Sequence, residues 1–335
     1  MSYIVEVLDQ RNNQDLLNLT NTGGTGSDLF RVDRAPDFFA LSSEMGDTVT
    51  YGLLREEKLI GCIAVSRQTR FIRDSAQNVY YLHDLRLHPD YFSTIAYYRL
   101  VHHVYHIYRE KTEWVFVTLL DSNRNTRILT KETSLLPPVS LLGKMVHVGI
   151  PMFIPLRPNS PQGQVVRLTA DEAWNEYSQT VRGINFAPAD YERFCAVNGY
   201  FLGIREGREI IAVCKIVDQT KSRKLVAAKT LPIYRLLMNP LCAWKGCPPL
   251  PAKGEIFRHG YLSYYASKAG DYRRDFLSFV TRHTPLNFTF VFMGLSESEA
   301  TAWKTPFKLQ LSSTIYTYGL NPADLTFDYR ELTLV

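Results

Sequence analysis

The sequence predicts an α/β fold with a mixed (α+β) sheet, arranged as two domains. Three observations lead to this prediction: strand-like and helix-like segments alternate, the same order of segments occurs twice, and a stretch poor in core-forming residues separates the two occurrences. The chain has 335 residues, which is long for one hydrophobic core. We expect domains at residues 1–157 and 165–335, joined by a linker at 158–164 within the run RPNSPQGQ.

β-favouring runs and apolar residues at helical spacing define the expected elements of the first half. In chain order these are a strand at 3–8, a helix at 12–19, a Gly-rich turn at 23–26, a helix at 36–44, strands at 49–55 and 58–67, a strand and helix within 79–108, a strand at 114–120, a short helix from about Asn123, and strands at 144–148 and 152–156. This alternation is typical of a layered α/β domain.

The second half repeats the order. Its expected elements are a strand at 165–168, a helix from Asp171, a helix at 188–197, strands at 200–205 and 209–217, a strand at 261–267, a helix at 272–281 and a strand at 288–293. Residues 230–254 contain Met238-Asn239-Pro240 and Cys247-Pro248-Pro249, and are too rich in proline for regular structure. We expect a long loop there, either a lid or binding surface or a cover over a sheet edge.

The run VYYLHDLRLHPDYFSTIAYYRLV at 79–101 is predicted to be a buried strand that turns at His-Pro-Asp and enters a helix. Ser93 or Thr94 can serve as the N-cap of this helix. The first amides of a helix have no intrahelical partner and carry partial positive charge, so they stabilise a phosphate-bearing ligand. The junction is therefore the predicted ligand site.

Four stretches of the first half form a recognisable set: Pro36-Asp37-Phe38-Phe39, the hairpin at 51–66 with Leu59-Ile60-Gly61, the run YLHDLRLHPDY at 81–91, and the strand at 114–120 followed by Asp121, Ser122 and Asn123. With them the first half resembles the GNAT superfamily of acyl-CoA-dependent N-acetyltransferases. The whole chain resembles a tandem GNAT protein, since the second half matches in element order and hairpin pattern. The resemblance implies two tandem GNAT-like acyltransferase domains, the second degenerate.

The resemblance also implies a cofactor site. In this family a splayed strand hydrogen-bonds the pantetheine arm through its backbone, and the following loop and helix N-terminus bind the pyrophosphate. Acetyl-CoA would be the co-substrate, and the residues carried over to its binding are Leu85, Arg86, Leu87, Ser93, Thr94, Ile95, Ala96 and Asn123. The family's loop carries Arg or Gln followed by two glycines, whereas the corresponding positions here are Phe92, Ile95 and Tyr97, whose side chains would crowd the approach of a phosphate.

Acetyl transfer to an amine needs a base for the amine proton and an acid for the departing thiolate. His83, Asp84 and His88 are candidates for the base. The family's acid tyrosine corresponds to about Thr130, so Tyr97 or Tyr98 would have to serve as the acid, and the predicted catalytic set is His83, Asp84 and Tyr97. Neighbours on a strand alternate in direction, so we expect at most one of His83 and Asp84 to face a cleft, the other being structural or solvated.

The composition limits partners and location. The net charge of +5 is small for this length, and no block of Lys or Arg makes nucleic acid a leading partner. The N-terminal MSYIVEVLDQ does not read as a secretory signal and no stretch has the length of a membrane span, so we expect a cytoplasmic protein without a membrane partner. The expected acceptor is a small-molecule or peptide amine, and a homodimer is left open.

We predict no metal site. Cys242 and Cys247 lie close together with His259 downstream, but a second paired cluster is missing. His102 and His106 are at helical spacing for one face, with no third ligand nearby in sequence. The five cysteines are an odd number and fit reduced thiols better than disulfides.

Two hypotheses for function follow. The first is an acyl-CoA-dependent N-acetyltransferase that transfers an acetyl group to an amine of an unidentified acceptor. The second is a catalytically inactive GNAT-like pair that acts as a ligand-binding or protein-interaction module. The absent loop glycines and acid tyrosine favour the second hypothesis, and the intact strand-turn-helix junction favours the first.

Overall fold

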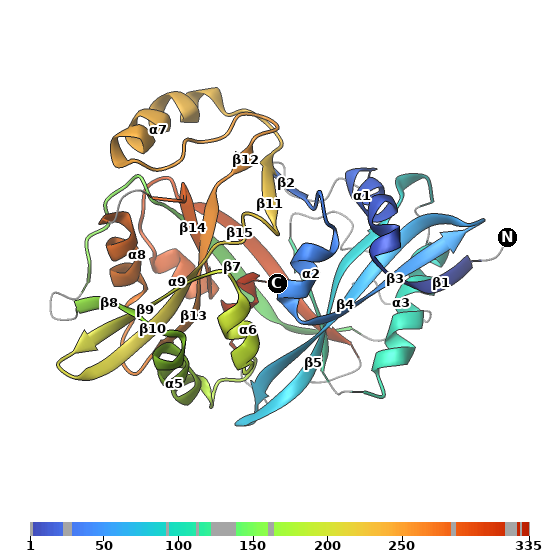
Figure 1. The fold of residues 1–335 in the computed structure, drawn as a ribbon, viewed down its shortest axis with the longest axis horizontal. Helices are drawn as coiled ribbons and strands as arrows, with labels where there is room; N and C mark the ends of the chain where they lie inside the picture. The colour runs from blue at the N-terminus through green and yellow to red at the C-terminus, as the bar shows by residue number, and fades with distance from the viewer. Residues whose placement is uncertain are drawn as a thin grey trace.

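Runs of β-branched and aromatic residues form the strands of a large sheet, and amphipathic segments form the helices packed on it (Figure 1). The computed structural model describes residues 3–22, 29–91, 94–111, 114–121, 139–159, 164–282, 286–318, 327–328 and 330–334. The Gly-rich turn expected at 23–26 and the short helix expected from about Asn123 lie outside these residues.

The elements of the first half follow the predicted order. Its strands are β1 (Tyr3–Leu8), β2 (Phe30–Asp33), β3 (Asp47–Arg55), β4 (Lys58–Ile72), β5 (Ser75–Leu87), β6 (Val115–Leu120) and β7 (Val139–Pro151). Its helices are α1 (Asn13–Thr22), α2 (Phe39–Met45) and α3 (Thr94–Tyr108), with the 3-10 turns η1 (Gln10–Asn12) and η2 (Pro89–Tyr91).

The second half repeats this order with additions. Its strands are β8 (Gln164–Leu168), β9 (Gly199–Glu206), β10 (Glu209–Val217), β11 (Lys224–Ala227), β12 (Ile256–Phe257), β13 (His259–Ser267), β14 (Phe290–Leu295) and β15 (Leu309–Tyr318). Its helices are α5 (Ala170–Val181), α6 (Tyr191–Ala196), α7 (Pro232–Lys245), α8 (Arg273–Arg282) and α9 (Glu297–Ala302), with the 3-10 turn η3 (Arg330–Leu334).

A single 12-stranded sheet runs through both halves, in the order β1-β3-β4-β5-β6-β15-β7-β14-β13-β10-β9-β8. Most neighbours are antiparallel, while β5 and β6 pair parallel, as do β13 and β14. The mixed sheet confirms the predicted fold class. A second sheet of 3 strands, β12-β11-β2, joins an early strand to two late ones.

The centre of the large sheet is built from strands that are far apart in sequence. β15, near the C-terminus, lies between β6 and β7 and pairs antiparallel with both. β7 precedes the expected linker, yet its other edge pairs with β14 of the second half. The halves thus share one hydrogen-bonded sheet, and the linker expected at 158–164 remains a prediction.

A second seam joins the end of β4 to residues 186–189. The amide of Phe71 donates to the carbonyl of Ala187, the amide of Phe186 donates to the carbonyl of Phe71, and the amide of Ala189 donates to the carbonyl of Thr69. The fully buried Arg70 guanidinium donates to the carbonyl of Phe186 at 2.7 Å. Burial lowers the pKa of Arg70 to about 10, which leaves it charged at neutral pH.

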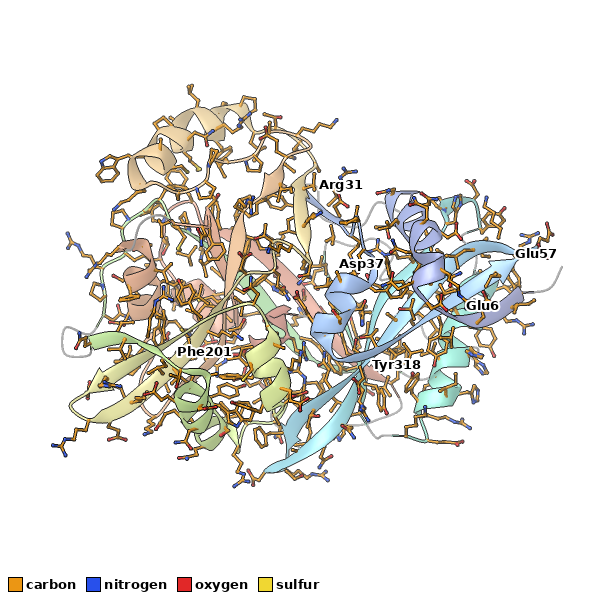
Figure 2. All side chains as sticks on the ribbon, in the orientation of Figure 1. Glu6, Arg31, Asp37, Glu57, Phe201 and Tyr318 are labelled. Carbon is orange, nitrogen blue, oxygen red and sulfur yellow. The ribbon has the colours of Figure 1, made fainter. Side chains whose placement is uncertain are left out.

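Helices cover both faces of the first half. Ile63 belongs to the apolar cluster that contains α3, whereas the adjacent Cys62 belongs to the cluster that contains α1. Because neighbours on a strand point to opposite faces, α1 and α3 lie on opposite sides of the sheet. Tyr318, at the end of β15, is buried in the α3 cluster (Figure 2).

Two sequence expectations about elements are wrong. Residues 152–156 are not a strand, because β7 already ends at Pro151 after a single long run. The proline-rich stretch 230–254 contains a 14-residue helix, α7, with Pro232 in its first turn and Pro240 inside it. Proline fits the first turn of a helix because its missing N–H would have no partner there. None of the helices in the described residues has the length and hydrophobicity needed to cross a bilayer.

Candidate functional site

The parallel strands β5 and β6 form the frame of the candidate site. Their register covers only Tyr80–Leu82 against Val115–Val117. Beyond this point β6 continues along β15, with Leu120 opposite Ser313, while β5 continues along β4. The two strands therefore diverge after three paired residues. β5 then leads through η2 into α3, which confirms the predicted strand-turn-helix junction.

Asp84 lies at a kink in the diverging part of β5. Its φ of 50° is in the left-handed region, and the pairing with β4 shifts by one residue between Cys62 and Ala64. The bulge cancels the strand alternation at this point. His83 and Asp84 consequently lie together, with 3.1 Å between His83 Nδ1 and Asp84 Oδ2. The expectation that at most one of them faces a cleft stays a prediction, although the regular strand alternation on which it rests is interrupted here by the bulge.

Asp84 is held by two buried arginines. Arg34 Nη1 lies 3.0 Å from one carboxylate oxygen, and Arg86 Nη2 lies 3.2 Å from the other. Burial alone would raise the pKa of Asp84, but the charge of Arg34, with His83 and Arg86, holds it well below its usual range. The carboxylate is therefore ionised. Arg34 also donates to the carbonyl of Phe38 at 2.6 Å, which ties the bulge to the loop before α2.

His83 connects Asp84 to a buried serine. Ser66 Oγ lies 2.7 Å from His83 Nε2, and Thr48 Oγ1 lies 2.6 Å from Ser66 Oγ. With Asp84 ionised, Nδ1–H of His83 donates to the carboxylate and Nε2 accepts from Ser66, an assignment made from the hydrogen-bond network. The order Ser-His-Asp is that of an activated nucleophile. Here Ser66 is fully buried, so the relay in this conformation orders the bulge.

Tyr97, the predicted acid, is buried in the first turn of α3. It packs in the core with Leu100, Val101 and Tyr318. Burial and the neighbouring Tyr318 hydroxyl raise the pKa of Tyr97 above its ordinary value. A phenol whose pKa is raised gives up its proton less readily, so burial of Tyr97 disfavours the acid role. That role stays a prediction.

The residues expected to bind the cofactor divide along the junction. Arg86 and Leu87 are buried and Leu85 is half-buried at the end of β5. Thr94 is the first residue of α3, followed by the exposed Ile95 and the buried Ala96. Ser93 and Asn123 lie outside the described residues. The structure thus brings the strand end and the helix N-terminus together, as the phosphate-site hypothesis requires.

The second half contains the same geometry. β13 and β14 pair in parallel only over His259–Tyr261 against Phe290–Phe292. Tyr264 has a φ of 51°, and the pairing of β13 with β10 shifts at Val213 and Lys215. A parallel pair that parts after three residues beside a bulge therefore occurs twice. The sequence indicated the repeated element order, but the bulges leave no pattern in residue type.

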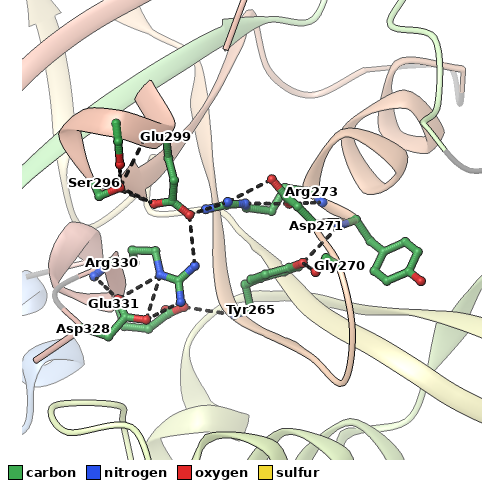
Figure 3. A network of polar contacts seen from close by, with 11 residues as sticks. Tyr265, Gly270, Asp271, Arg273, Ser296, Glu299, Asp328, Arg330 and Glu331 are labelled. Atoms are coloured by element: carbon green, nitrogen blue, oxygen red, sulfur yellow. Dashed lines mark hydrogen bonds and ion pairs between the residues drawn. The ribbon is translucent and has the colours of Figure 1, made fainter. Parts of the chain in front are cut away.

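Glu331 occupies the second bulge (Figure 3). Its carboxylate accepts the backbone N–H of Tyr264 at 2.6 Å and that of Tyr265 at 2.9 Å. Burial raises the pKa of Glu331 to about 7, although both amides favour the charged form. Sequence reasoning missed Glu331, since an acidic residue near the C-terminus carries no signal of its own.

Side chains of the protein also cap the N-terminus of α8, the helix that follows the second bulge. Tyr265 Oη accepts the N–H of Tyr272, and Asp271 accepts the N–H of Arg273, both at 3.0 Å. The Arg273 guanidinium bridges Asp271 and Glu299, which also contacts Arg330 (Figure 3). Two backbone amides at the start of α8, those of Tyr272 and Arg273, thus already have partners. Asp271 adds negative charge there.

Two cavities are described, both lined mainly by residues of the second half, with Leu29 and Phe30 of the first half in the wall of the larger one. A small one lies beside Glu331, lined by Tyr265, Arg273 and Arg330 among others. A larger one, of about 370 Å³, lies under α7 and is mainly apolar, with Phe257, Phe290 and Leu309 in its wall. Neither includes a residue of the β5/β6 junction in its lining.

A metal centre was not predicted, and the described residues contain no cluster of three or more His, Cys, Asp or Glu side chains that could hold an ion. His102 and His106 face each other on the outer side of α3, with 2.8 Å between their Nε2 atoms. The described cysteines are free thiols.

Comparison with known proteins supports the fold. No family model matches the sequence, and no curated protein matches it. Among solved structures, N-myristoyltransferase from Saccharomyces cerevisiae with bound myristoyl-CoA has a TM-score of 0.59 and 12% identity, over 96% of this chain and 80% of that one. A GCN5-related N-acetyltransferase from Anabaena variabilis has a TM-score of 0.55 and 11% identity, over 94% and 72%. A probable N-acyltransferase from Enterococcus faecalis has a TM-score of 0.54 and 8% identity, over 95% of this chain and 72% of that one. With two splayed parallel strand pairs, each followed by a helix, this chain has the fold of the GNAT superfamily, as two GNAT-like units in tandem.

Proposed function

We propose that this protein is an acyl-CoA-dependent N-acyltransferase whose N-terminal half binds the co-substrate between β5 and β6. The observation that carries the proposal is the parting of these strands after three paired residues, directly before the N-terminus of α3. The structures with the same fold include N-acyltransferases and an enzyme with bound myristoyl-CoA, which supports an acyl-CoA ligand here. The proposed acyl group is acetyl, and the proposed acceptor is a small-molecule or peptide amine.

The proposed division of labour follows the junction. The backbone of Leu85–Leu87 would hydrogen-bond the pantetheine arm, and the first turn of α3 at Thr94–Ala96 would face the pyrophosphate. The ion pairs of Asp84 with Arg34 and Arg86 fix the bulge, so the backbone groups need no reorganisation on binding. His83 and Tyr97 are the proposed base and acid. A cytoplasmic location remains a prediction.

A second candidate function rests on the same residues. Both ring nitrogens of His83 are already hydrogen-bonded, and Tyr97 is enclosed in the α3 core. A base needs a nitrogen that reaches the substrate proton, directly or through one water. The hydrogen-bonded His83 and the buried Tyr97 fit a catalytically inactive GNAT-like pair that binds a ligand or a protein.

The first experiment is a calorimetric titration of the full chain with acetyl-CoA and with longer acyl-CoA esters. Thr94→Glu should weaken binding at least tenfold, because a carboxylate at the start of α3 repels the pyrophosphate while suiting the helix dipole and thus the fold. The matched control is Gln14→Glu, which adds the same charge in the first turn of α1 and should leave affinity unchanged.

Turnover separates the two functions. Release of free thiol from the bound ester in the presence of a mixture of amines and peptides supports the enzyme. Tight binding that Thr94→Glu abolishes, without thiol release for any acceptor, supports the inactive module. Failure of the wild-type chain to bind any acyl-CoA would contradict the N-terminal site itself.

A further inference from the structure

The helix α7 exposes an apolar stripe. Ile233, Leu236, Leu237, Leu241 and Trp244 recur at the spacing of one helix face and are all exposed. Ile233 is 72%, Leu236 76% and Trp244 73% exposed. A helix of a globular protein normally turns such a stripe toward the core. α7 lies at the periphery of the molecule, where the stripe has no cover within the described residues (Figure 1).

The orientation of α7 is fixed from its other side. Met238 and Cys242 are its buried residues, and Met238 forms part of the wall of the larger cavity beneath. Arg235 Nε donates to the carbonyl of Leu250, and Asn239 Oδ1 accepts the N–H of the same residue. The helix ends at Gly246 in the left-handed conformation, where glycine is favoured. These contacts hold the apolar stripe outward, so its exposure is built into the fold.

The segment around α7 is strongly cationic. Residues 219–254 contain seven Lys and Arg and no Asp or Glu, although the whole chain has a net charge of only +5. Lys229 and Lys253 are exposed before and after the helix, and Thr230 Oγ1 accepts the N–H of Lys253, which brings their two loops together. Lys245 Nζ lies 4.9 Å from the Trp244 ring centroid at the other end. Positive charge thus flanks the apolar stripe at both ends.

We infer that α7 docks this protein onto the surface of an anionic lipid bilayer. An exposed apolar stripe with an indole, flanked by cations and without an acidic residue on the helix itself, suits the boundary between lipid headgroups and acyl chains. The attraction of the flanking cations to acidic lipids adds to burial of the stripe. At 14 residues α7 is roughly 21 Å long, too short to cross a bilayer, so it lies along the surface.

The test is co-sedimentation of the full chain with phosphatidylcholine vesicles that contain or lack phosphatidylglycerol. Binding to the anionic vesicles alone is expected, and added salt should weaken it. Trp244 is the only exposed one of the four tryptophans, so the fluorescence emission should also shift to shorter wavelength on binding. Lys229→Glu with Lys253→Glu should lower the partition coefficient on the order of tenfold.

Ile233→Ser with Leu236→Ser should abolish vesicle binding while leaving thermal stability unchanged, because both side chains are exposed. The matched control is Ile4→Ser with Val7→Ser, which removes similarly exposed apolar groups from β1 and should keep binding intact. Absence of wild-type binding, or equal binding by the α7 variant, would overturn the inference. So would a dimer in light scattering that the α7 variant converts to monomer, since the stripe would then be covered by a second copy.

Discussion

The two pairs of diverging parallel strands have the same backbone geometry, but a different carboxylate lies at the bulge of each. In both, a parallel register of three residues ends beside a residue with positive φ, Asp84 in β5 and Tyr264 in β13. In the first half, the bulge residue itself supplies the carboxylate, which two arginines hold. In the second half, the carboxylate comes from Glu331, which binds the bulge amides directly.

The difference shows how one backbone geometry supports two roles. A bulge at the parting of two strands turns consecutive amides toward one point, which suits a carboxylate or a ligand carbonyl. In the second half the protein satisfies these amides itself, and Asp271 and Tyr265 cap the following helix. In the first half the carboxylate stabilises the bulge from its side chain. We therefore expect ligand binding in the first half alone.

The strongest test of the comparison is Asp84→Asn. It removes the carboxylate charge that faces the buried Arg34, and breaking a buried ion pair costs about 3–5 kcal/mol. Urea unfolding should show a loss of this size in the free energy of unfolding. Asp9→Asn, which breaks the exposed pair with Arg11, should change it little. If Asp84→Asn lowers the free energy of unfolding as little as Asp9→Asn does, the ion pairs of Asp84 do not stabilise the first bulge, and the contrast with the second bulge is lost.

The next effect is a pH dependence due to Glu331. Its pKa is raised from 4.5 to about 7, so the folded state binds this proton more tightly than the unfolded chain. Its contribution to stability is full below pH 4.5 and is lost as pH rises to about 7, by about 3 kcal/mol. Unfolding free energies measured across this range should reveal it.

Glu331→Gln removes that pH dependence. The amide accepts one of the two bulge N–H groups and leaves the other unsatisfied, at about 1–3 kcal/mol. Glu297→Gln, an exposed change on α9, is the control and should leave the pH profile as it is. If the unfolding free energy of Glu331→Gln keeps the same pH dependence, another group titrates. Binding of Glu331 to the amides of the second bulge is then not the source of the pH dependence.

The smallest expected effect belongs to Tyr265→Phe. It deletes the hydroxyl that accepts the N–H of Tyr272 at the start of α8, a bond of 3.0 Å. Thermal unfolding should register a loss of about 1 kcal/mol, typical of one hydrogen bond. Tyr234→Phe, whose ring is exposed on α7, should have no effect. Equal changes in both would show that the cap at α8 is not needed to close the second site.

The sequence predicted the frame better than its details. The strand at 261–267 and the helix at 272–281 match β13 and α8 closely, because local patterning alone specifies them. β15 was not predicted, because Ser312, Ser313 and Thr314 interrupt its apolar pattern. These polar residues fit in the strand because β15 forms backbone hydrogen bonds with a strand on each side. α7 was missed because its two prolines suggested a loop, although one begins the helix.

The candidate site shows a similar limit. The junction of strand and helix was predictable, because the hydrophobic period changes within a few residues at Pro89. The bulge at Asp84 was not, since its support comes from Arg34, which is 50 residues away in sequence. Glu331 lies even farther from the amides it binds. Contacts between distant segments, rather than local propensity, decide which groups meet at both bulges.

The place of β15 in the sheet has a consequence for biosynthesis. Phe116 of β6 pairs with Thr317 of β15, so a growing chain must be extended by most of its length before β6 gains this neighbour. During translation the facing edges of β6 and β7 have no partner strand, and such edges invite pairing with other chains. Contacts this distant in sequence also slow folding. Until β15 is made and closes the middle of the sheet, these two edges are therefore open to pairing with other chains.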